Sequence, residues 1–159
     1  MEGYVLGIDP GTTNFAFALT DVQSHRVVAV RSVKLQRSDT NVAIAMSVCA
    51  LLGALARGMK VIHVAVEQQL RQPMIEICQS VVTWAYTQNI SCEVVSAYTW
   101  RRRVGARNKK SWAANKKNSV DYCCWTLGYP VQDHNLAEAI MISLGATAHH
   151  FSPRPDALL

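Results

Sequence analysis

Apolar residues in the first part of the chain are grouped in three short runs separated by turn residues. The runs cover 4–8, 14–21 and 26–35, and Asp9-Pro10-Gly11 follows the first of them. Short runs rich in β-branched and aromatic residues, bounded by Asp, Pro and Gly, are typical of strands joined by tight turns. The pattern predicts three antiparallel strands at the start of a sheet.

Further along, the apolar spacing alternates between that of helices and that of strands. A helix is expected at 41–57, where apolar residues recur every three or four positions, with Asp39 or Thr40 as N-cap and Gly58 as the stop. Further strands are expected at 61–66 and 92–96, and further helices at 72–87, 109–127 and 135–149. This order predicts an α/β fold, with a mixed β-sheet of three antiparallel strands and then parallel strands, flanked by helices on both faces.

The length and composition suit one folded domain. We expect that domain at 1–150 and an irregular tail at 151–159, because 159 residues match one core and half of them are apolar. No apolar run reaches the roughly 18 residues of a membrane span, and none precedes the first strand as a leader. The five cysteines lack metal-ligand spacing, which fits a reducing compartment. An intracellular protein without a membrane partner is expected; cytoplasm, viral factory and organelle matrix are not distinguished.

Positive charge is concentrated in one segment. The net charge is only +5, but no acidic residue lies between Val94 and Val120. Half of all Lys and Arg lie there: Arg101, Arg102, Arg103, Arg107, Lys109, Lys110, Lys116 and Lys117. Such a block favours a polyanionic partner, such as nucleic acid. The alternative is a solvated basic face with no partner.

Two carboxylates stand at the ends of expected buried strands. Asp9 follows the first strand, and Glu67 follows the strand at 61–66. Asp9 alone could be a turn residue, because Asp-Pro-Gly is a common turn sequence. If the two strands are neighbours, however, the two carboxylates lie close and raise each other's pKa unless a cation intervenes. Oxygen donors without a Cys or His cluster favour Mg²⁺ or Mn²⁺ over zinc.

A third polar group opens the last expected helix. His134, Asn135 and Glu138 share one helical face after Asp133. The residues also fit an N-cap at Asp133 or Asn135 with Glu138 as the capping-box partner, and both interpretations can hold together. Strand carboxylates and helix-borne ligands together are the arrangement used in two-metal phosphodiester cleavage, with the ions roughly 4 Å apart.

Four segments, in order, resemble a known family. Residues 8–16, with Asp9 followed by Pro-Gly-Thr-Thr-Asn-Phe-Ala, resemble the first-strand motif of RuvC-type Holliday junction resolvases of the RNase H-like superfamily. The poxvirus, large-DNA-virus and mitochondrial resolvases are the most similar branch. Residues 66–69 resemble the second motif, 96–117 the lysine-bearing third, and 135–139 the last, usually Asp-x-x-Asp-Ala.

The resemblance implies a structure-selective endonuclease that resolves four-way DNA junctions by paired symmetric nicks. It implies a homodimer, two Mg²⁺ or Mn²⁺ ions per active site and no small-molecule cofactor. The implied catalytic residues are the metal ligands Asp9, Glu67, Asn135 and Glu138 and, at the active-site edge, Lys110 and Lys117; His134 is a further candidate ligand. The alternatives are another RNase H-like nuclease, acting on RNA–DNA hybrids or forked DNA, and a junction-binding protein with impaired catalysis.

Asn135 departs from the family pattern, which has Asp or sometimes His there, and neutral Asn binds Mg²⁺ poorly. Three explanations stay open: His134 is the ligand, Asn135 coordinates through its amide oxygen, or an aspartate has been replaced by engineering.

The same resemblance extends the predicted DNA-binding surface beyond the basic segment. The expected DNA-binding residues are Gln69, Arg71, Gln72, Arg101, Arg102, Arg103, Arg107, Lys109, Lys110, Lys116 and Lys117. Trp100 and Trp112 could stack on bases or pack in the core. The helix at 72–87 is widely apolar, which fits either a dimer interface or cover by other helices.

Overall fold

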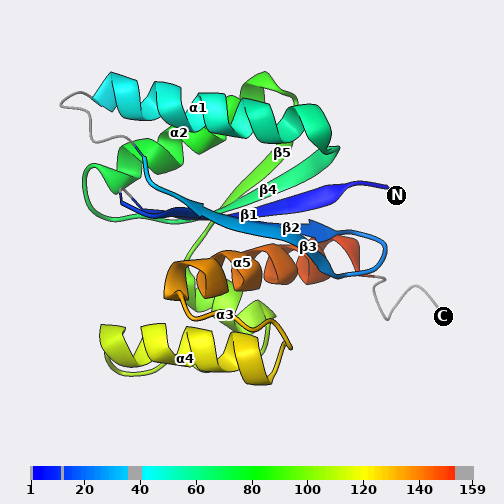
Figure 1. Ribbon diagram of the computed structural model, residues 1–159, viewed down its shortest axis with the longest axis vertical. Coiled ribbons are helices and arrows are strands. Elements are labelled where there is room, and N and C mark those ends of the chain that lie inside the picture. Colours follow the sequence, from blue (N-terminus) through cyan, green and yellow to red (C-terminus); the bar gives the residue numbers. More distant parts are fainter. Residues whose placement is uncertain (1, 12, 36–40, 153–159) are drawn as a thin grey trace.

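Five strands within the described residues form one mixed sheet in the order β3-β2-β1-β4-β5 (Figure 1). They are β1 (Tyr4–Pro10), β2 (Phe15–Asp21), β3 (Val27–Val33), β4 (Val61–Glu67) and β5 (Ser91–Val95). Strands β1, β2 and β3 are antiparallel neighbours, whereas β4 is parallel to β1 and β5 is parallel to β4. The predicted meander followed by parallel strands is confirmed.

This computed structural model describes residues 2–11, 13–35 and 41–152. The expected N-caps Asp39 and Thr40 and most of the expected tail therefore lie outside the described residues. Within them, no helix is both long enough and apolar enough to cross a membrane.

Helices cover both faces of the sheet, as predicted (Figure 1). On one face lie α1 (Asn41–Gly58) and α2 (Met74–Thr87). On the other lie α3 (Ala97–Arg103), α4 (Trp112–Trp125) and α5 (His134–Phe151). Helix α5 packs on β1 and β2, while α4 packs on α5 and forms an outer layer. Helix α1 packs on α2, and this contact accounts for at least part of the wide apolar surface of α2.

One helix was not predicted from the sequence, and two others begin two or three residues later than predicted. Helix α3 was not predicted; Ser96 caps it by accepting a hydrogen bond from the Thr99 amide. Helix α4 begins three residues after the expected start, because the Ser111 side chain accepts from Ala114 N and fixes the first turn there. Helix α2 begins after Pro73 instead of at residue 72.

The contact between α5 and the sheet is unusually close at Gly7. A Cβ at that position would lie 2.3 Å from the Ser143 backbone nitrogen, so only glycine lets the helix approach. Ser143 Oγ is also 2.5 Å from Thr20 Oγ and 3.1 Å from the Val5 carbonyl oxygen. These contacts fix α5 across β1 and β2, and so fix where its first turns meet the ends of β1 and β4.

Candidate metal centre and nucleic-acid interface

Three carboxylates converge where β1 and β4 end and α5 begins. Asp9 lies near the end of β1 and Glu67 at the end of β4, and the neighbouring pair Ile8 and Val66 is in register. Glu138 projects from the second turn of α5. Each carboxylate offers an oxygen within 4.8 Å of the others. The structure thus brings together three of the residues that the sequence nominated for metal binding.

Burial makes negative charge costly in this carboxylate cluster. Asp9 is 5% exposed, and its Oδ2 has no hydrogen-bond partner among the described residues. Burial, and then the charges of Glu67 and Glu138, raise the pKa of Asp9 well above its usual range. Burial and Glu138 likewise raise the pKa of Glu67. A bound divalent cation would offset this repulsion, so the cluster is suited to hold one.

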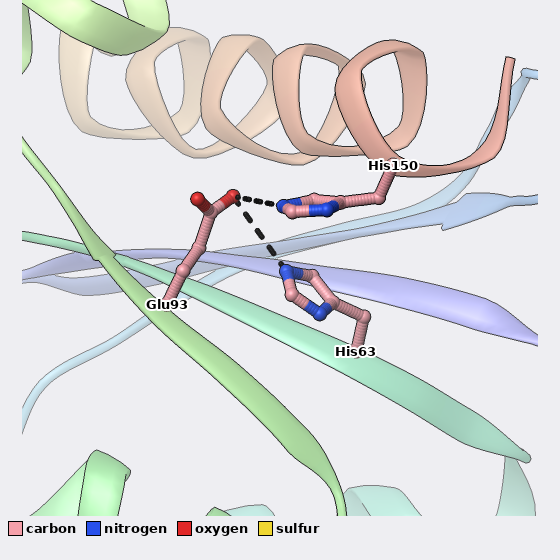
Figure 2. A group of neighbouring side chains, drawn as sticks. All are labelled: His63, Glu93 and His150. Atoms are coloured by element: carbon pink, nitrogen blue, oxygen red, sulfur yellow. Dashed lines mark ion pairs between the residues drawn. The ribbon is translucent and has the colours of Figure 1, made fainter. Parts of the chain in front are cut away.

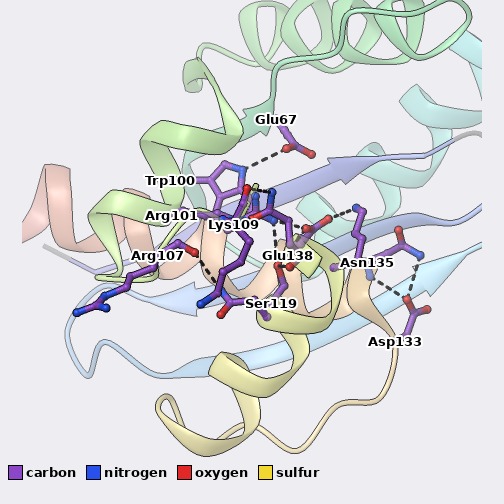
Figure 3. Close-up of polar contacts among 12 residues, drawn as sticks. Glu67, Trp100, Arg101, Arg107, Lys109, Ser119, Asp133, Asn135 and Glu138 are labelled. Atoms are coloured by element: carbon purple, nitrogen blue, oxygen red, sulfur yellow. Dashed lines mark hydrogen bonds and ion pairs between the residues drawn. The ribbon is translucent and has the colours of Figure 1, made fainter. Parts of the chain in front are cut away.

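Glu138 is held in place by two cations and a hydroxyl group (Figure 3). Arg101 Nη2 donates to Glu138 Oε1 at 2.6 Å, and Ser119 Oγ donates to the same oxygen at 3.1 Å. Lys116 Nζ donates to Oε2. The Arg101 guanidinium in turn lies 4.3 Å from the centre of the Trp100 ring. Three elements, α3, α4 and α5, therefore position this carboxylate.

Arg101 corrects one prediction from the sequence. It was expected to bind DNA, but it is only 4% exposed and its charge is paired with Glu138. The unpredicted helix α3 is the reason, because it turns Arg101 inward while the neighbouring Arg102 stays exposed. Arg103 is also paired, with both of its terminal nitrogens donating to Glu93.

The lysine beside the carboxylate cluster is Lys116, and not Lys110 or Lys117 as predicted. Successive residues on an α-helix are about 100° apart around the axis, so Lys116 and Lys117 point in different directions. Lys117 is largely exposed and pairs with Asp121, one turn later, at 2.5 Å. Lys110 lies exposed in the segment before α4. Sequence spacing could not fix the helix rotation that distinguishes these lysines.

Trp100 belongs to the core and not to a base-stacking surface. It is fully buried, and its Nε1 donates to Glu67 Oε1 at 3.3 Å. The side chain of Gln69, a predicted DNA contact, donates to Glu67 Oε2 at 3.4 Å. Sequence reasoning missed the supporting roles of Trp100, Arg101 and Ser119. Ser96, a good N-cap residue just before them, was the available signal for α3.

The residues at the start of α5 form a helix cap. Asp133 Oδ1 accepts hydrogen bonds from the backbone and side-chain nitrogens of Asn135, at 2.8 and 2.9 Å. The His134 ring lies edge-on to Trp112, with ring centres 6.2 Å apart. His134 is not among the His, Cys, Asp and Glu groups that converge on the cluster within the described residues. The predicted N-cap at Asp133 is confirmed. The Glu138 side chain is bound by Arg101, Lys116 and Ser119 and does not form a capping box.

The other basic side chains of residues 101–117 are exposed on α3, on α4 and on the segment between these helices. Asn115 holds the backbone of Lys109 through two hydrogen bonds, and Asn118 Nδ2 donates to the carbonyl oxygen of Arg107. These bonds fasten the segment between α3 and α4 to α4 itself (Figure 3). We define the basic rim as the exposed side chains of Arg102, Arg107, Lys109, Lys110 and Lys117. The predicted contacts Arg71 and Gln72 are exposed beyond the end of β4.

Comparison with known proteins identifies the fold. No family model matches the sequence, and no curated protein matches it. Comparison with solved structures shows that the chain has the RNase H-like fold of the RuvC-type Holliday junction resolvases. Thermus thermophilus RuvC in complex with a Holliday junction substrate superposes with a TM-score of 0.71 at 16% identity, covering 92% of this chain and 94% of that one.

Two further solved structures of similar fold are resolvases. The yeast mitochondrial Holliday junction resolvase has a TM-score of 0.63 at 12% identity, covering 92% of this chain and 82% of that one. The fowlpox virus resolvase, solved with its substrate Holliday junction DNA, has a TM-score of 0.63 at 15% identity, covering 91% and 99%. These similarities confirm the predicted fold class.

Proposed function

We propose that this protein is a metal-dependent endonuclease that resolves four-way DNA junctions by paired nicks. The observation that carries the proposal is the convergence of Asp9, Glu67 and Glu138 in a buried cluster, with one Asp9 oxygen lacking a hydrogen-bond partner among the described residues. The cluster lies in a fold shared with resolvases solved on junction DNA. The exposed basic rim supplies the charge that a branched phosphate backbone requires.

The donor set fits Mg²⁺ or Mn²⁺, of which we propose two ions per active site. Asp9, Glu67 and Glu138 would hold them, because all three offer hard oxygen ligands and the uncompensated charge is on Asp9 and Glu67. When bound, such ions supply the Lewis acidity that activates water and stabilises the leaving oxygen in phosphodiester hydrolysis.

The protein's own residues orient the reacting groups. Trp100 fixes Glu67 by a donated hydrogen bond, and Arg101 with Ser119 fixes Glu138. Lys116 pairs with the outer oxygen of Glu138 and keeps part of its side chain exposed. We propose that Lys116 contacts the scissile phosphate and stabilises the negative charge that develops there.

The basic rim would hold the junction arms. Its five cations lie on α3, on α4 and on the segment between these helices, and both helices pack on α5. Trp112 is 73% exposed, and Lys116 lies 5.6 Å from the centre of its ring, so this indole is the available aromatic for a base exposed at the branch point.

Paired nicks require two active sites, and we therefore propose a homodimer. A chain mass of 17.6 kDa makes the test direct: light scattering after size exclusion should give about twice that mass. A monomer at the concentration that supports cleavage would contradict the proposal.

Labelled substrates test the function. The protein is incubated with four-way junctions, forked DNA and RNA–DNA hybrids, in Mg²⁺ or in EDTA. Paired nicks in the junction alone, dependent on Mg²⁺, are expected. Asp9→Asn and Glu67→Gln should bind the junction normally but lose about a thousand-fold or more in cleavage rate, because metal stabilisation of the transition state is worth several kcal/mol.

Other outcomes identify the alternatives. Equal cleavage of every substrate would indicate a general RNase H-like nuclease without junction selectivity. Tight, junction-selective binding without cleavage in any divalent metal would indicate a junction-binding protein. Near-normal cleavage by Asp9→Asn would refute the assignment of the metal centre.

A further inference from the structure

A second cluster of metal-ligand side chains lies at the opposite end of the sheet from the carboxylate cluster. It consists of His63 on β4, Glu93 on β5 and His150 near the end of α5 (Figure 2). His63 and Glu67 lie on the same face of β4 at its two ends. The rise of an α-helix places His150 about 18 Å from Glu138 along α5. The two clusters are therefore separate.

The distances from Glu93 to the two histidines are close to those between ligands of a single tetrahedral ion. Glu93 Oε1 lies 3.6 Å from His63 Nε2 and 3.2 Å from His150 Nε2. Zinc bonds to nitrogen and oxygen of about 2.0–2.1 Å, at tetrahedral angles, place ligand atoms about 3.4 Å apart. All three groups already offer an atom within 4.8 Å of the others. Little movement would be needed to enclose an ion.

The His63 ring is buried, and its Nε2 faces Glu93 Oε1 across 3.6 Å, beyond hydrogen-bonding distance. His63 is 3% exposed, and its Nε2 has no hydrogen-bond partner among the described residues. Its other ring nitrogen, Nδ1, lies 3.0 Å from Ser91 Oγ. Metal-bound histidines are commonly oriented in this way, by a hydrogen bond to the nitrogen that does not bind the metal. A buried nitrogen left without a hydrogen bond needs a reason, and a cation supplies one.

Glu93 is oriented from outside the cluster. Arg103 Nη1 donates to its Oε1 at 2.6 Å, and Nη2 donates to Oε2 at 3.0 Å. A carboxylate oxygen has two acceptor positions, so Oε1 can serve Arg103 and still face the histidines. Burial would raise the pKa of Glu93, but the adjacent His63 ring, the hydrogen bonds from Arg103 and the nearby charges outweigh it and hold this pKa far below its usual range.

His150 is the accessible member of the cluster. Its Nε2 lies 3.2 Å from Glu93 Oε1. About one third of its side chain is exposed, so an ion can enter there.

We propose that His63, Glu93 and His150 bind one late first-row divalent cation, with Zn²⁺ favoured and water as the fourth ligand. Two imidazole nitrogens and one carboxylate oxygen suit zinc, whereas the oxygen-only carboxylate cluster suits Mg²⁺ or Mn²⁺. The bound ion joins the end of α5 to β4 and β5. It thereby stabilises the packing of α5, the helix that also carries Glu138.

The experiment is a calorimetric titration of the full chain with Zn²⁺ in excess Mg²⁺, which occupies the carboxylate cluster. One equivalent of zinc should bind. His150→Ala should weaken zinc binding by about ten- to a hundred-fold or more, because removing even a group that only orients a metal ligand lowers metal affinity by this factor. His149→Ala is the matched control, because His149 is the adjacent exposed histidine and is not a member of the cluster. It should bind zinc like the wild type.

Two further readouts distinguish this site from the free cysteines. Cobalt(II) should give the visible absorption of a tetrahedral nitrogen–oxygen site, and this absorption should be lost in His150→Ala. Zinc should raise the melting temperature of the wild type and of His149→Ala, but not of His150→Ala. Zinc affinity unchanged by His150→Ala, equal losses in both histidine variants, or no zinc bound by the wild type would each overturn the proposal.

Discussion

At the scale of single residues, Asp9 bears a carboxylate in surroundings that disfavour its charge. One of its oxygens lacks a hydrogen bond from any described residue, and two other carboxylates lie beside it. Such an arrangement costs stability unless a cation is bound, so the carboxylate cluster without an ion is electrostatically unfavourable.

Asp9→Asn should therefore stabilise the protein in EDTA, in a pH-dependent way. The pKa of Asp9 is raised on folding, so the folded wild type binds more protons than the unfolded chain and loses stability as pH rises through the raised pKa. The amide that replaces the carboxyl group in the variant does not titrate. The difference in unfolding free energy between variant and wild type should thus grow as pH rises from about 4 and then level off.

Denaturant unfolding at a series of pH values in EDTA measures this difference. Adding Mg²⁺ should shrink or reverse it, because the ion stabilises only the wild-type cluster. Parallel stability curves for the two proteins, with and without Mg²⁺, would contradict the electrostatic account of Asp9.

At the scale of elements, the short helix α3 connects the basic segment to the carboxylate cluster. It buries Arg101 between the Trp100 ring and Glu138, so a residue from a basic run supports the carboxylate cluster from inside. Helix α3 therefore positions two carboxylates, because Trp100 donates to Glu67 and Arg101 pairs with Glu138.

Arg101→Ala should destabilise the fold by about 3–5 kcal/mol, because it leaves Glu138 buried with one cation fewer. Thermal and denaturant unfolding measure the loss. Arg102→Ala, one residue further along the same helix and exposed, is the control and should change stability by less than about 0.5 kcal/mol. Equal effects of the two substitutions would show that the Arg101–Glu138 pair is not a main support of the cluster.

The rotation of α4 decides which lysine acts at the cluster. Lys116→Ala should lower the single-turnover cleavage rate, measured with saturating protein, by about a hundred-fold or more. Removing one donor to a negative charge that develops in the transition state has an effect of this size. Lys117→Ala should keep that rate and only weaken binding, because Lys117 pairs with Asp121 in solvent. The opposite ranking would mean that Lys117, as the sequence suggested, reaches the scissile phosphate.

At the scale of the whole molecule, the basic rim and the carboxylate cluster occupy the same side of the sheet as α5. Lys109→Ala with Lys110→Ala should flatten the slope of log affinity against log salt for junction binding, by about 0.9 for each phosphate that the variant no longer neutralises. The cleavage rate at saturation should stay unchanged, since neither lysine contacts the carboxylate cluster. Arg57→Ala, an exposed cation at the end of α1 beyond the opposite face, is the control and should leave the slope as it is. Equal slopes for all three proteins would exclude the rim from DNA binding.

The sequence by itself determined the order of the strands and of the helices other than α3, the antiparallel start of the sheet and the two strand-end carboxylates. Apolar periodicity is a local property that reports which face of a strand or helix is buried. Parallel strands end at the same edge, so Asp9 and Glu67 were expected together once their strands were expected to be neighbours. This prediction missed α3. Its seven residues are too few to show a clear helical period, and they are rich in arginine.

Only the tertiary structure decided which polar side chains meet. The pairing of Arg101 with Glu138, the choice of Lys116 over Lys117, and the His63–Glu93–His150 cluster all depend on how α3, α4 and α5 are rotated against the sheet. That rotation is set by contacts between segments far apart in the chain, such as Gly7 against Ser143. Local sequence patterns carry no information on such contacts, because they record which residues are buried but not against which partner.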